Sequence, residues 1–169
     1  PAIADGVMVW HNGYDNQIYA YAKGPSRLTV DAPSLGVTTN TPITIKGTIT
    51  DISAGTKQQA VAANFPDGLP CVSDASQSHF MEAVYQQQAM PTNLTGVPIA
   101  IYVVDSNGNY RTIGTTVSNA YGTYSVTWTP DIPGEYTVIA DFAGTESYYP
   151  SKAATVFCAS EPIAAPTTQ

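Results

Sequence analysis

Short segments that alternate apolar and polar residues, separated by turn residues, constrain the fold of this chain most. Residues 42–51 show the pattern well, because Ile43, Ile45 and Ile49 fall on one side of an extended backbone. A period of two is typical of a strand with one buried face. Segments of strand length also cover residues 27–31, 97–105, 110–117, 121–129, 135–142 and 153–158. About seven short strands with turns every 8 to 12 residues predict an all-β, antiparallel β-sandwich.

The turns between these segments support this prediction. Asn107-Gly108 separates residues 97–105 from residues 110–117, and this dipeptide favours a hairpin turn. Residues 130–134, Pro-Asp-Ile-Pro-Gly, are a second turn signal. We therefore expect consecutive strands to run antiparallel.

Residues 55–95 interrupt the strand pattern with a polar, Gln-rich stretch. Within it, residues 73–89 predict a helix, since Asp74 and Gln77 resemble a capping box and Pro91 ends the pattern. The apolar residues at helical spacing are Phe80, Met81, Val84 and Tyr85. A helix inserted into a sandwich usually covers an open end or a sheet edge. The alternative is a partner-binding element.

Residues 1–24 form a separate N-terminal part. Two short apolar runs, residues 7–10 and 17–22, flank a turn rich in Asn, Gly and Asp, which predicts a β-hairpin. The sandwich then covers residues 25–160. Residues 161–169 are rich in Pro, Ala and Thr, as in an extended linker or the beginning of a stalk.

The composition is typical of a secreted protein, so we expect the chain to lie outside the cell. Charged residues make up 11% of it, against about 25% in an average domain, so Ser, Thr, Asn and Gln must cover the surface. The net charge of −7 disfavours nucleic acid and anionic membranes as partners. No run approaches the roughly 20 apolar residues of a membrane span, and no signal peptide is evident, so we expect a mature or excised fragment.

Cys71 and Cys158 are the two cysteines of the chain. Their spacing fits no metal-binding motif. Two interpretations remain from the residues: a disulfide that closes a long loop, or two free buried thiols. The composition typical of a secreted protein favours the first, so we expect a bond between Cys71 and Cys158.

Few residues point to catalysis. The histidines are His11 and His79, and no Gly-x-Ser-x-Gly nucleophile elbow is present. His79 and Glu82 lie one helical turn apart, but two ligands at that spacing indicate a solvated helix face rather than a metal site. We therefore expect neither an enzyme nor a bound metal or cofactor.

The carboxylates also favour a structural interpretation. Nothing selects a facing pair of the kind that a glycosidase uses, and acidic residues in turns are the default. Residues 105–109 resemble a calcium loop, but they lack a downstream bidentate Glu and fit a hairpin turn better. The carboxylates at strand ends or in turns are Asp105, Asp131, Glu135, Asp141 and Glu146.

Two surface features remain. Asn93-Leu-Thr95 is an N-glycosylation acceptor sequence in a predicted loop, so Asn93 is a candidate glycosylation site. Two interpretations of the 11 tyrosines remain. Exposed tyrosines can stack on sugars or form an adhesive face, whereas tyrosines at alternating strand positions pack within a sheet.

Residues 114–151 resemble the immunoglobulin-like (Ig-like) repeats of bacterial and archaeal cell-surface proteins. In those repeats a G-x-Y-x-x-x-W-x-P strand precedes G-x-Y-x-V-x-A-x-F-x-G and then Y-x-P-S. The matching residues are Gly122, Tyr124, Trp128, Pro130, Gly134, Tyr136, Phe142, Gly144, Tyr149 and Pro150. With residues 42–51 and 97–105 the resemblance covers about 120 residues and implies an Ig-like β-sandwich, but a shared fold does not determine function.

Residues 5–24 resemble the closing blade strands of pyrroloquinoline-quinone-type β-propeller repeats, as found in archaeal surface proteins. In such proteins an Ig-like domain, a Pro/Thr stalk and a membrane anchor follow the propeller. The resemblance implies that this chain is the C-terminal part of such a protein. It is too short to hold a propeller, so no cofactor site carries over.

The sequence therefore predicts a non-catalytic, extracellular Ig-like module with a structural or adhesive role on a cell surface. One alternative is a filament subunit, assembled when the N-terminal segment donates a strand to a neighbour. Another is a carbohydrate-binding module that uses exposed tyrosines. The expected partners are proteins, further copies of the chain, or glycans.

Overall fold

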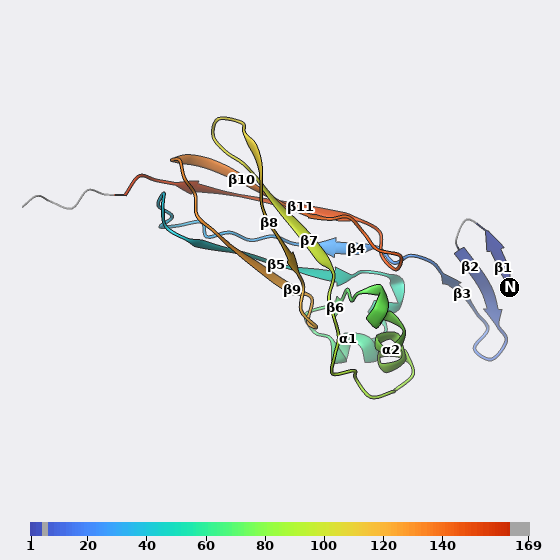
Figure 1. Cartoon of the computed structure of the whole chain (residues 1–169). Helices are drawn as coiled ribbons and strands as arrows, with labels where there is room; N and C mark the ends of the chain where they lie inside the picture. The colour runs from blue at the N-terminus through green and yellow to red at the C-terminus, as the bar shows by residue number, and fades with distance from the viewer. Residues whose placement is uncertain (5–6, 163–169) are drawn as a thin grey trace, which may run out of the picture.

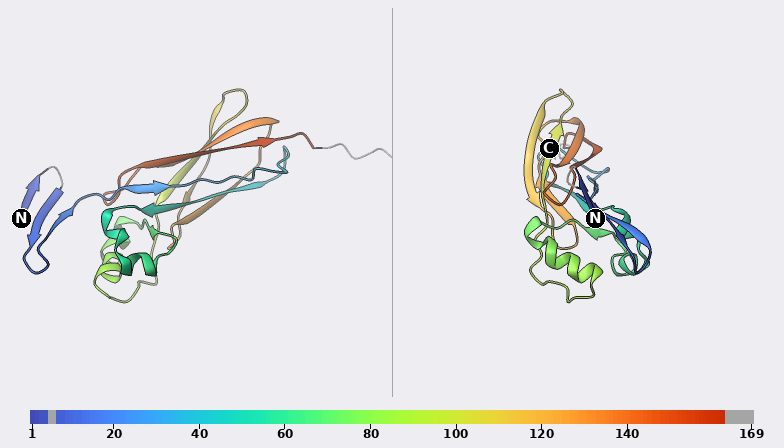
Figure 2. Two further views of the ribbon diagram at one scale, coloured as in Figure 1. Left: turned by 180° about the vertical axis from the view of Figure 1, so that it is seen from behind. Right: turned by 90° about the vertical axis from the view of Figure 1, so that its right-hand side faces the viewer.

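The computed structural model describes residues 1–4 and 7–162. Strands make up 45% of the protein and helices 14%, and the strands form three antiparallel sheets (Figure 1). Two of the sheets face one another in a β-sandwich-like body, and the third, N-terminal sheet lies beyond one end of it (Figures 1 and 2). The predicted all-β class is confirmed.

The first face of the sandwich is a four-stranded sheet in the order β11-β10-β7-β8. The second face contains β4, β5 and β6, with β9 paired to β5 along residues 43–48. The strands are β4 (Ser26–Leu28), β5 (Ile43–Asp51), β6 (Leu69–Pro70), β7 (Pro98–Val104), β8 (Tyr110–Val117), β9 (Thr123–Trp128), β10 (Gly134–Phe142) and β11 (Ser151–Ala159).

The buried residues of β5 and β10 agree with the alternation predicted from the sequence. Ile45 and Ile49 of β5 are fully buried and face the isoleucines of β7, since successive side chains of a strand point to opposite faces. In β10 the alternation is complete: every second residue is inaccessible to solvent and the residues between them are partly exposed. The buried residues of β10 are Tyr136, Val138, Ala140 and Phe142.

Residues 24–39 close one open side of the sandwich. They pair antiparallel with β5 through β4 and through a bridge between Asp31 and Lys46. They also form two isolated parallel bridges, from Gly24 to Tyr148 and from Thr38 to Ser160, to residues that flank β11 of the other sheet. The segment therefore holds the two sheets together from the edge.

The interruption at residues 52–97 packs against one end of the sandwich. It contains a short 3-10 helix η1 (Ala54–Lys57), α1 (Gln59–Asn64), β6 and α2 (Asp74–Tyr85). Val61, Leu69, Val72 and Phe80 form a second, smaller apolar cluster there.

The predicted helix exists but is shorter than residues 73–89, because α2 ends at Tyr85. The capping-box prediction was wrong. Ser73 is the N-cap and its side chain makes no capping bond. Asp74 instead accepts hydrogen bonds from the backbone N–H groups of Glu146 and Ser147, at 3.1 and 3.0 Å. Gln77 accepts a hydrogen bond from the Tyr148 hydroxyl at 3.1 Å. Asp74 and Gln77, the two residues predicted to cap the helix, therefore attach α2 to the loop between β10 and β11.

The N-terminal hairpin is present as β2 (Val7–Asn12) and β3 (Gln17–Tyr21), and β1 (Ala2–Ala4) adds a third strand beside β2. Figure 2 shows this sheet set apart from the sandwich. The predicted linker over residues 161–169 lies outside the described residues except for Glu161 and Pro162, and so do residues 5 and 6 of the propeller-like stretch.

Gly47 of β5 provides a test of how the strands pack. A Cβ at this position overlaps the carbonyl oxygen of Thr29 and the hydroxyl of Tyr124. Gly47→Ala is therefore expected to lower the free energy of unfolding by about 1–3 kcal/mol, as overpacking does, measured by urea denaturation. Gly13→Ala is the control, because no atom lies within 4 Å of its added Cβ. Equal stability of the two variants would contradict the described packing.

Candidate functional site

The N-terminal sheet presents an aromatic face. Cross-strand partners in an antiparallel sheet share a face, and the pairs here are Ile3 with Met8, Met8 with Tyr21, and Trp10 with Tyr19. The ring centroids of Trp10 and Tyr19 lie 6.1 Å apart, and those of Tyr19 and Tyr21 lie 6.4 Å apart. Ile3 is 74% exposed and Tyr21 50% exposed. Solvent therefore reaches a face that carries no charged side chain.

The opposite face of the same sheet is aliphatic. Ala2 pairs with Val9, Val9 with Ala20, and His11 with Ile18. Ile18 is 74% exposed. A strand that is apolar on both faces is typical of a sheet covered on both sides. No such cover exists among the residues that the structure describes.

The turn between β2 and β3 is polar and well ordered by hydrogen bonds. The Tyr19 hydroxyl donates to the Asp15 carboxylate at 2.5 Å, and this bond holds the pKa of Asp15 below its usual value. The His11 ring lies 2.9 Å from the Asn16 side-chain oxygen. These bonds fix the hairpin register, so the two apolar faces have a defined arrangement.

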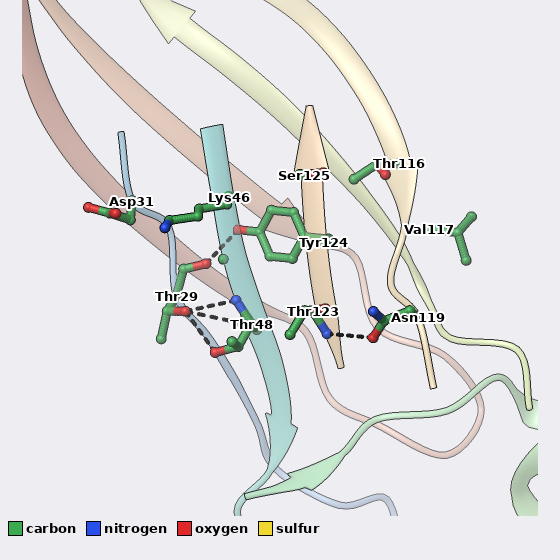
Figure 3. A pocket seen from close by; sticks show the side chains of 11 residues that line it. Thr29, Asp31, Lys46, Thr48, Thr116, Val117, Asn119, Thr123, Tyr124 and Ser125 are labelled. Carbon is green, nitrogen blue, oxygen red and sulfur yellow. Dashed lines mark hydrogen bonds between the residues drawn. The ribbon is translucent and has the colours of Figure 1, made fainter. Parts of the chain in front are cut away.

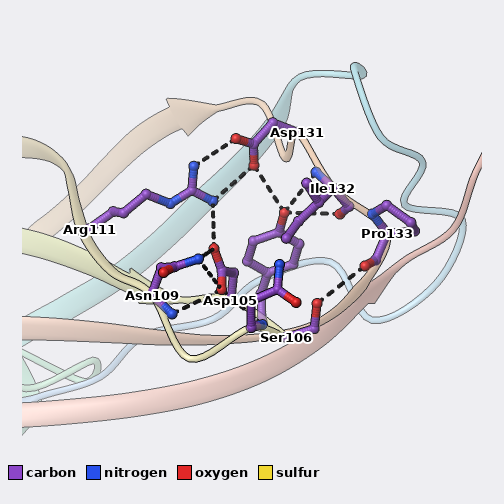
Figure 4. A network of polar contacts seen from close by, with 9 residues as sticks. Asp105, Ser106, Asn109, Arg111, Asp131, Ile132 and Pro133 are labelled. Atoms are coloured by element: carbon purple, nitrogen blue, oxygen red, sulfur yellow. Dashed lines mark hydrogen bonds and ion pairs between the residues drawn. The ribbon is translucent and has the colours of Figure 1, made fainter.

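A polar network joins two loops at one end of the sandwich (Figure 4). The Arg111 guanidinium donates to both carboxylate oxygens of Asp131, at 2.7 and 2.8 Å, and lies 3.5 Å from the buried carboxylate of Asp105. Arg111 also lies over the Trp128 ring, 6.0 Å from its centroid. The structure thus brings Asp105 and Asp131 together on one guanidinium, which both carboxylates contact.

Asp105 shows why residues 105–109 form a turn. One of its carboxylate oxygens accepts the backbone N–H groups of Asn107 and Asn109, at 2.9 and 3.0 Å. The Asn109 side chain donates to both oxygens. The carboxylate is therefore occupied by the turn itself, and the hairpin interpretation fits better than a calcium loop.

A groove of about 610 Å³ lies over β5, β8 and β9 (Figure 3). At its floor the Tyr124 hydroxyl crosses above Gly47 and donates to the Thr29 carbonyl at 2.5 Å. The hydroxyls of Thr29 and Thr48 lie 2.8 Å apart. Burial raises the pKa of Tyr124, so this hydroxyl stays protonated and acts as a structural donor.

The other residues considered for chemistry lie far apart in the fold. His11 is in β2, whereas His79 lies on α2, 3.3 Å from Glu82 and exposed to solvent. Asp141 pairs with Lys152 at 2.9 Å. Among the described residues, no three His, Cys, Asp or Glu side chains meet as a metal site. None of the helices in residues 1–4 and 7–162 is long and apolar enough to cross a membrane.

Beyond the aromatic face of the N-terminal sheet, which includes Tyr19 and Tyr21, exposed tyrosines lie in separate loops. Tyr14 is in the turn between β2 and β3, Tyr121 is between β8 and β9, and Tyr149 is between β10 and β11. Asn93 is exposed in the loop between α2 and β7, outside any helix or strand. Such a position is accessible to modification, and the glycosylation of Asn93 stays a prediction.

The disulfide between Cys71 and Cys158 is absent: both thiols are free, with Cys71 buried and Cys158 exposed. Cys71 follows β6, which pairs with the end of β5. At this end of the sandwich β4 begins at Ser26, and the Ser26 hydroxyl contacts that of Ser151 at the start of β11. Cys158 is seven residues further along β11, which is about 23 Å in an extended strand. A disulfide needs Cα atoms within about 7 Å, so the predicted bond was wrong.

The comparisons with known proteins give no relative: no family model matches the chain, and no curated protein matches it. The candidate site is therefore defined by geometry alone. It is the N-terminal sheet, with its two uncovered apolar faces. Sequence analysis found the hairpin but missed β1, because Ala2–Ala4 is too short to show a period.

The two thiols give a direct test of the cysteine geometry. Burial and the nearby Asp51 carboxylate raise the pKa of the Cys71 thiol, which keeps it unreactive. In the folded protein we expect one equivalent of a thiol reagent to react quickly, at Cys158, and the second only after unfolding in denaturant. Mass spectrometry locates the label. Protein without any reactive thiol before reduction would contradict the structure and restore the disulfide.

The Arg111–Asp131 pair predicts an acid-sensitive contribution to stability. The bond from Arg111 holds the pKa of Asp131 below its usual value. A depressed pKa stabilises the fold above the ordinary Asp value of about 4, and this contribution is lost as the pH falls towards the folded pKa. Since Asp131 is 53% exposed, Asp131→Asn should cost about 1 kcal/mol or less at pH 7.

Urea denaturation at pH 7 and at stepwise lower pH measures this effect. The difference between wild type and Asp131→Asn should shrink below about pH 4. Glu135→Gln is the control, because Glu135 makes no ion pair among the described residues. A difference that stays constant down to pH 2 would argue against the ion pair.

Proposed function

We propose that this chain is a non-catalytic, extracellular structural or adhesive module of a surface protein, built as an Ig-like β-sandwich. Its N-terminal sheet docks between neighbouring β-sheets. The observation that carries the proposal is that this sheet exposes apolar side chains on both faces.

The strand arrangement supports the Ig-like assignment. Eight strands divide into β4, β5, β6 and β9 on one sheet and β11-β10-β7-β8 on the other. Without the two-residue β6, this is close to the seven-strand sandwich of Ig-like domains. Tyr136 adds a second mark of this fold. It lies near the start of β10, and its hydroxyl donates to the Ile132 carbonyl at 2.9 Å and accepts the Ile132 N–H at 3.1 Å. A tyrosine bonded back to the preceding corner in this way is a tyrosine corner.

The exposed faces support docking through contact with other sheets. A small sheet has independent stability only when a hydrophobic face is covered by another element. The aromatic face and the aliphatic face both lack charges, so β-sheets with apolar faces fit them best. The resemblance of residues 5–24 to propeller blade strands points to the same kind of neighbour.

Strand pairing within the N-terminal sheet weighs against the filament alternative. β1, β2 and β3 already pair with one another, so donation of β2 requires those hydrogen bonds to open first. Tyr14, Tyr121 and Tyr149 lie in separate loops. Trp10, Tyr19 and Tyr21 do lie together, and we assign their face to docking rather than to a sugar.

Hydrogen exchange tests the docking. The amides of β2 and β3 should exchange quickly in the isolated chain, where the sheet has no cover, and slowly in the protein extracted from its native surface. The amides of β5, β7 and β10 serve as the internal control, because their core is complete in both samples. Equal exchange of β2 and β3 in the two samples would overturn the docking.

Two further measurements separate the alternatives. A membrane-impermeant amine reagent on intact cells should label Lys152, which is exposed on β11, and no labelling would rule out the surface location. Light scattering of the isolated chain should give a constant mass with concentration. A mass that grows with concentration would favour the filament.

A further inference from the structure

Residues 24–39 and β11 run parallel to each other and are joined at both ends. The two parallel bridges, Gly24 with Tyr148 and Thr38 with Ser160, lie at opposite ends of β11. Between them, residues 24–39 pair with β5 of the other sheet. The segment is thus a shared edge of both sheets.

Four hydrogen bonds join the segment to the loop and strand at the first end. The Gly24 N–H donates to the Ser147 carbonyl at 2.8 Å, and the Tyr149 N–H donates to the Gly24 carbonyl at 2.9 Å. The Ser26 hydroxyl donates to the Tyr149 carbonyl at 2.8 Å and lies 2.7 Å from the Ser151 hydroxyl.

A second set closes the other end. The Thr39 N–H donates to the Ser160 carbonyl at 2.9 Å, and the Ser160 N–H donates to the Val37 carbonyl at 3.0 Å. The Ser160 hydroxyl also donates to Val37, at 3.2 Å.

The chain enters and leaves the sandwich at opposite ends. The N-terminal sheet lies beyond the end of the sandwich at which β4 begins, and β11 ends at the opposite end (Figures 1 and 2). Tension between the N-terminal sheet and the residues after Ser160 pulls the segment and β11 in opposite directions along their axes. Because the strands are parallel, both sets of bonds take the load together instead of opening one after another.

Buried side chains oppose the same sliding motion. Leu28, Ala32, Val37 and Thr39 are each at most 7% exposed, so movement along the axis has to withdraw them from the core. The bond from the Tyr124 hydroxyl to the Thr29 carbonyl adds a tie to β9.

We propose that the sandwich is a load-bearing link, in which residues 24–39 and β11 form a shear clamp between the N-terminal sheet and the residues that follow Ser160. This function goes beyond the docking of the N-terminal sheet, because it assigns a mechanical role to the sandwich itself. If the clamp fails its test, the docking of the N-terminal sheet is unaffected.

Single-molecule pulling of the full chain tests the geometry. With handles at the two chain ends, the force is directed along β11. With one handle at the N-terminus and the other on Glu146→Cys, in a Cys158→Ser background, the force acts at the first end alone and opens its bonds in sequence. We expect a higher unfolding force in the first geometry. Equal forces in the two geometries would overturn the clamp.

Ser26→Ala tests the bonds themselves. It removes two hydroxyl contacts of the first end and should raise the unfolding rate under end-to-end load about fivefold, the effect of one ordinary hydrogen bond broken before the barrier. The matched control is Ser106→Ala, whose hydroxyl donates to the Pro133 carbonyl at 3.3 Å, away from the segment and β11. Similar acceleration by both variants, or none by Ser26→Ala, would reject the proposal.

Discussion

Tyr136 connects the apolar core of the sandwich to the polar network at one end of it. Its ring is fully buried, stacked on Phe157 at 5.2 Å and edge-on to Trp128 at 5.2 Å. Its hydroxyl reaches the backbone of Ile132, four residues earlier, and lies 3.1 Å from the Asp131 carboxylate. The chain passes from β9 in one sheet to β10 in the other at this corner, so one side chain sets both the sheet spacing and the turn.

The rest of that end depends on this corner. With Asp131 held by Tyr136, Arg111 of β8 reaches Asp131 and the buried Asp105 after β7, which ties the β7–β8 hairpin loop to the corner between β9 and β10. At the opposite end, Asp74 of α2 holds the β10–β11 loop through the N–H groups of Glu146 and Ser147. A chain with 11% charged residues thus uses several of its acids as hydrogen-bond acceptors for loops.

The sequence predicted those parts of the fold whose signal is local. Ile43, Ile45 and Ile49 alternate within one strand, and Asn107-Gly108 determines a turn by its own backbone preference. The functions of residues 24–39 and of the pair Asp74 and Gln77 depend on partners far away in the chain, which no period reveals. The disulfide prediction failed for the same reason: the distance between Cys71 and Cys158 depends on where β11 begins. The hairpin of the candidate site was predictable, but the exposure of both its faces required the structure.

The two proposed functions meet at Gly24. This residue is the last before the sandwich, and its backbone N–H and carbonyl both bond to the β10–β11 loop. Its Cα lies in contact with the sandwich, since an added Cβ would meet the Asp51 carboxylate and the Tyr148 ring at an ordinary packing distance of 3.5 Å. A force on the docked N-terminal sheet therefore reaches the sandwich at Gly24, where both backbone groups are hydrogen-bonded to the β10–β11 loop. The docked N-terminal sheet and the shear clamp then form one continuous path for force. Docking lets force enter the chain, and the clamp resists that force.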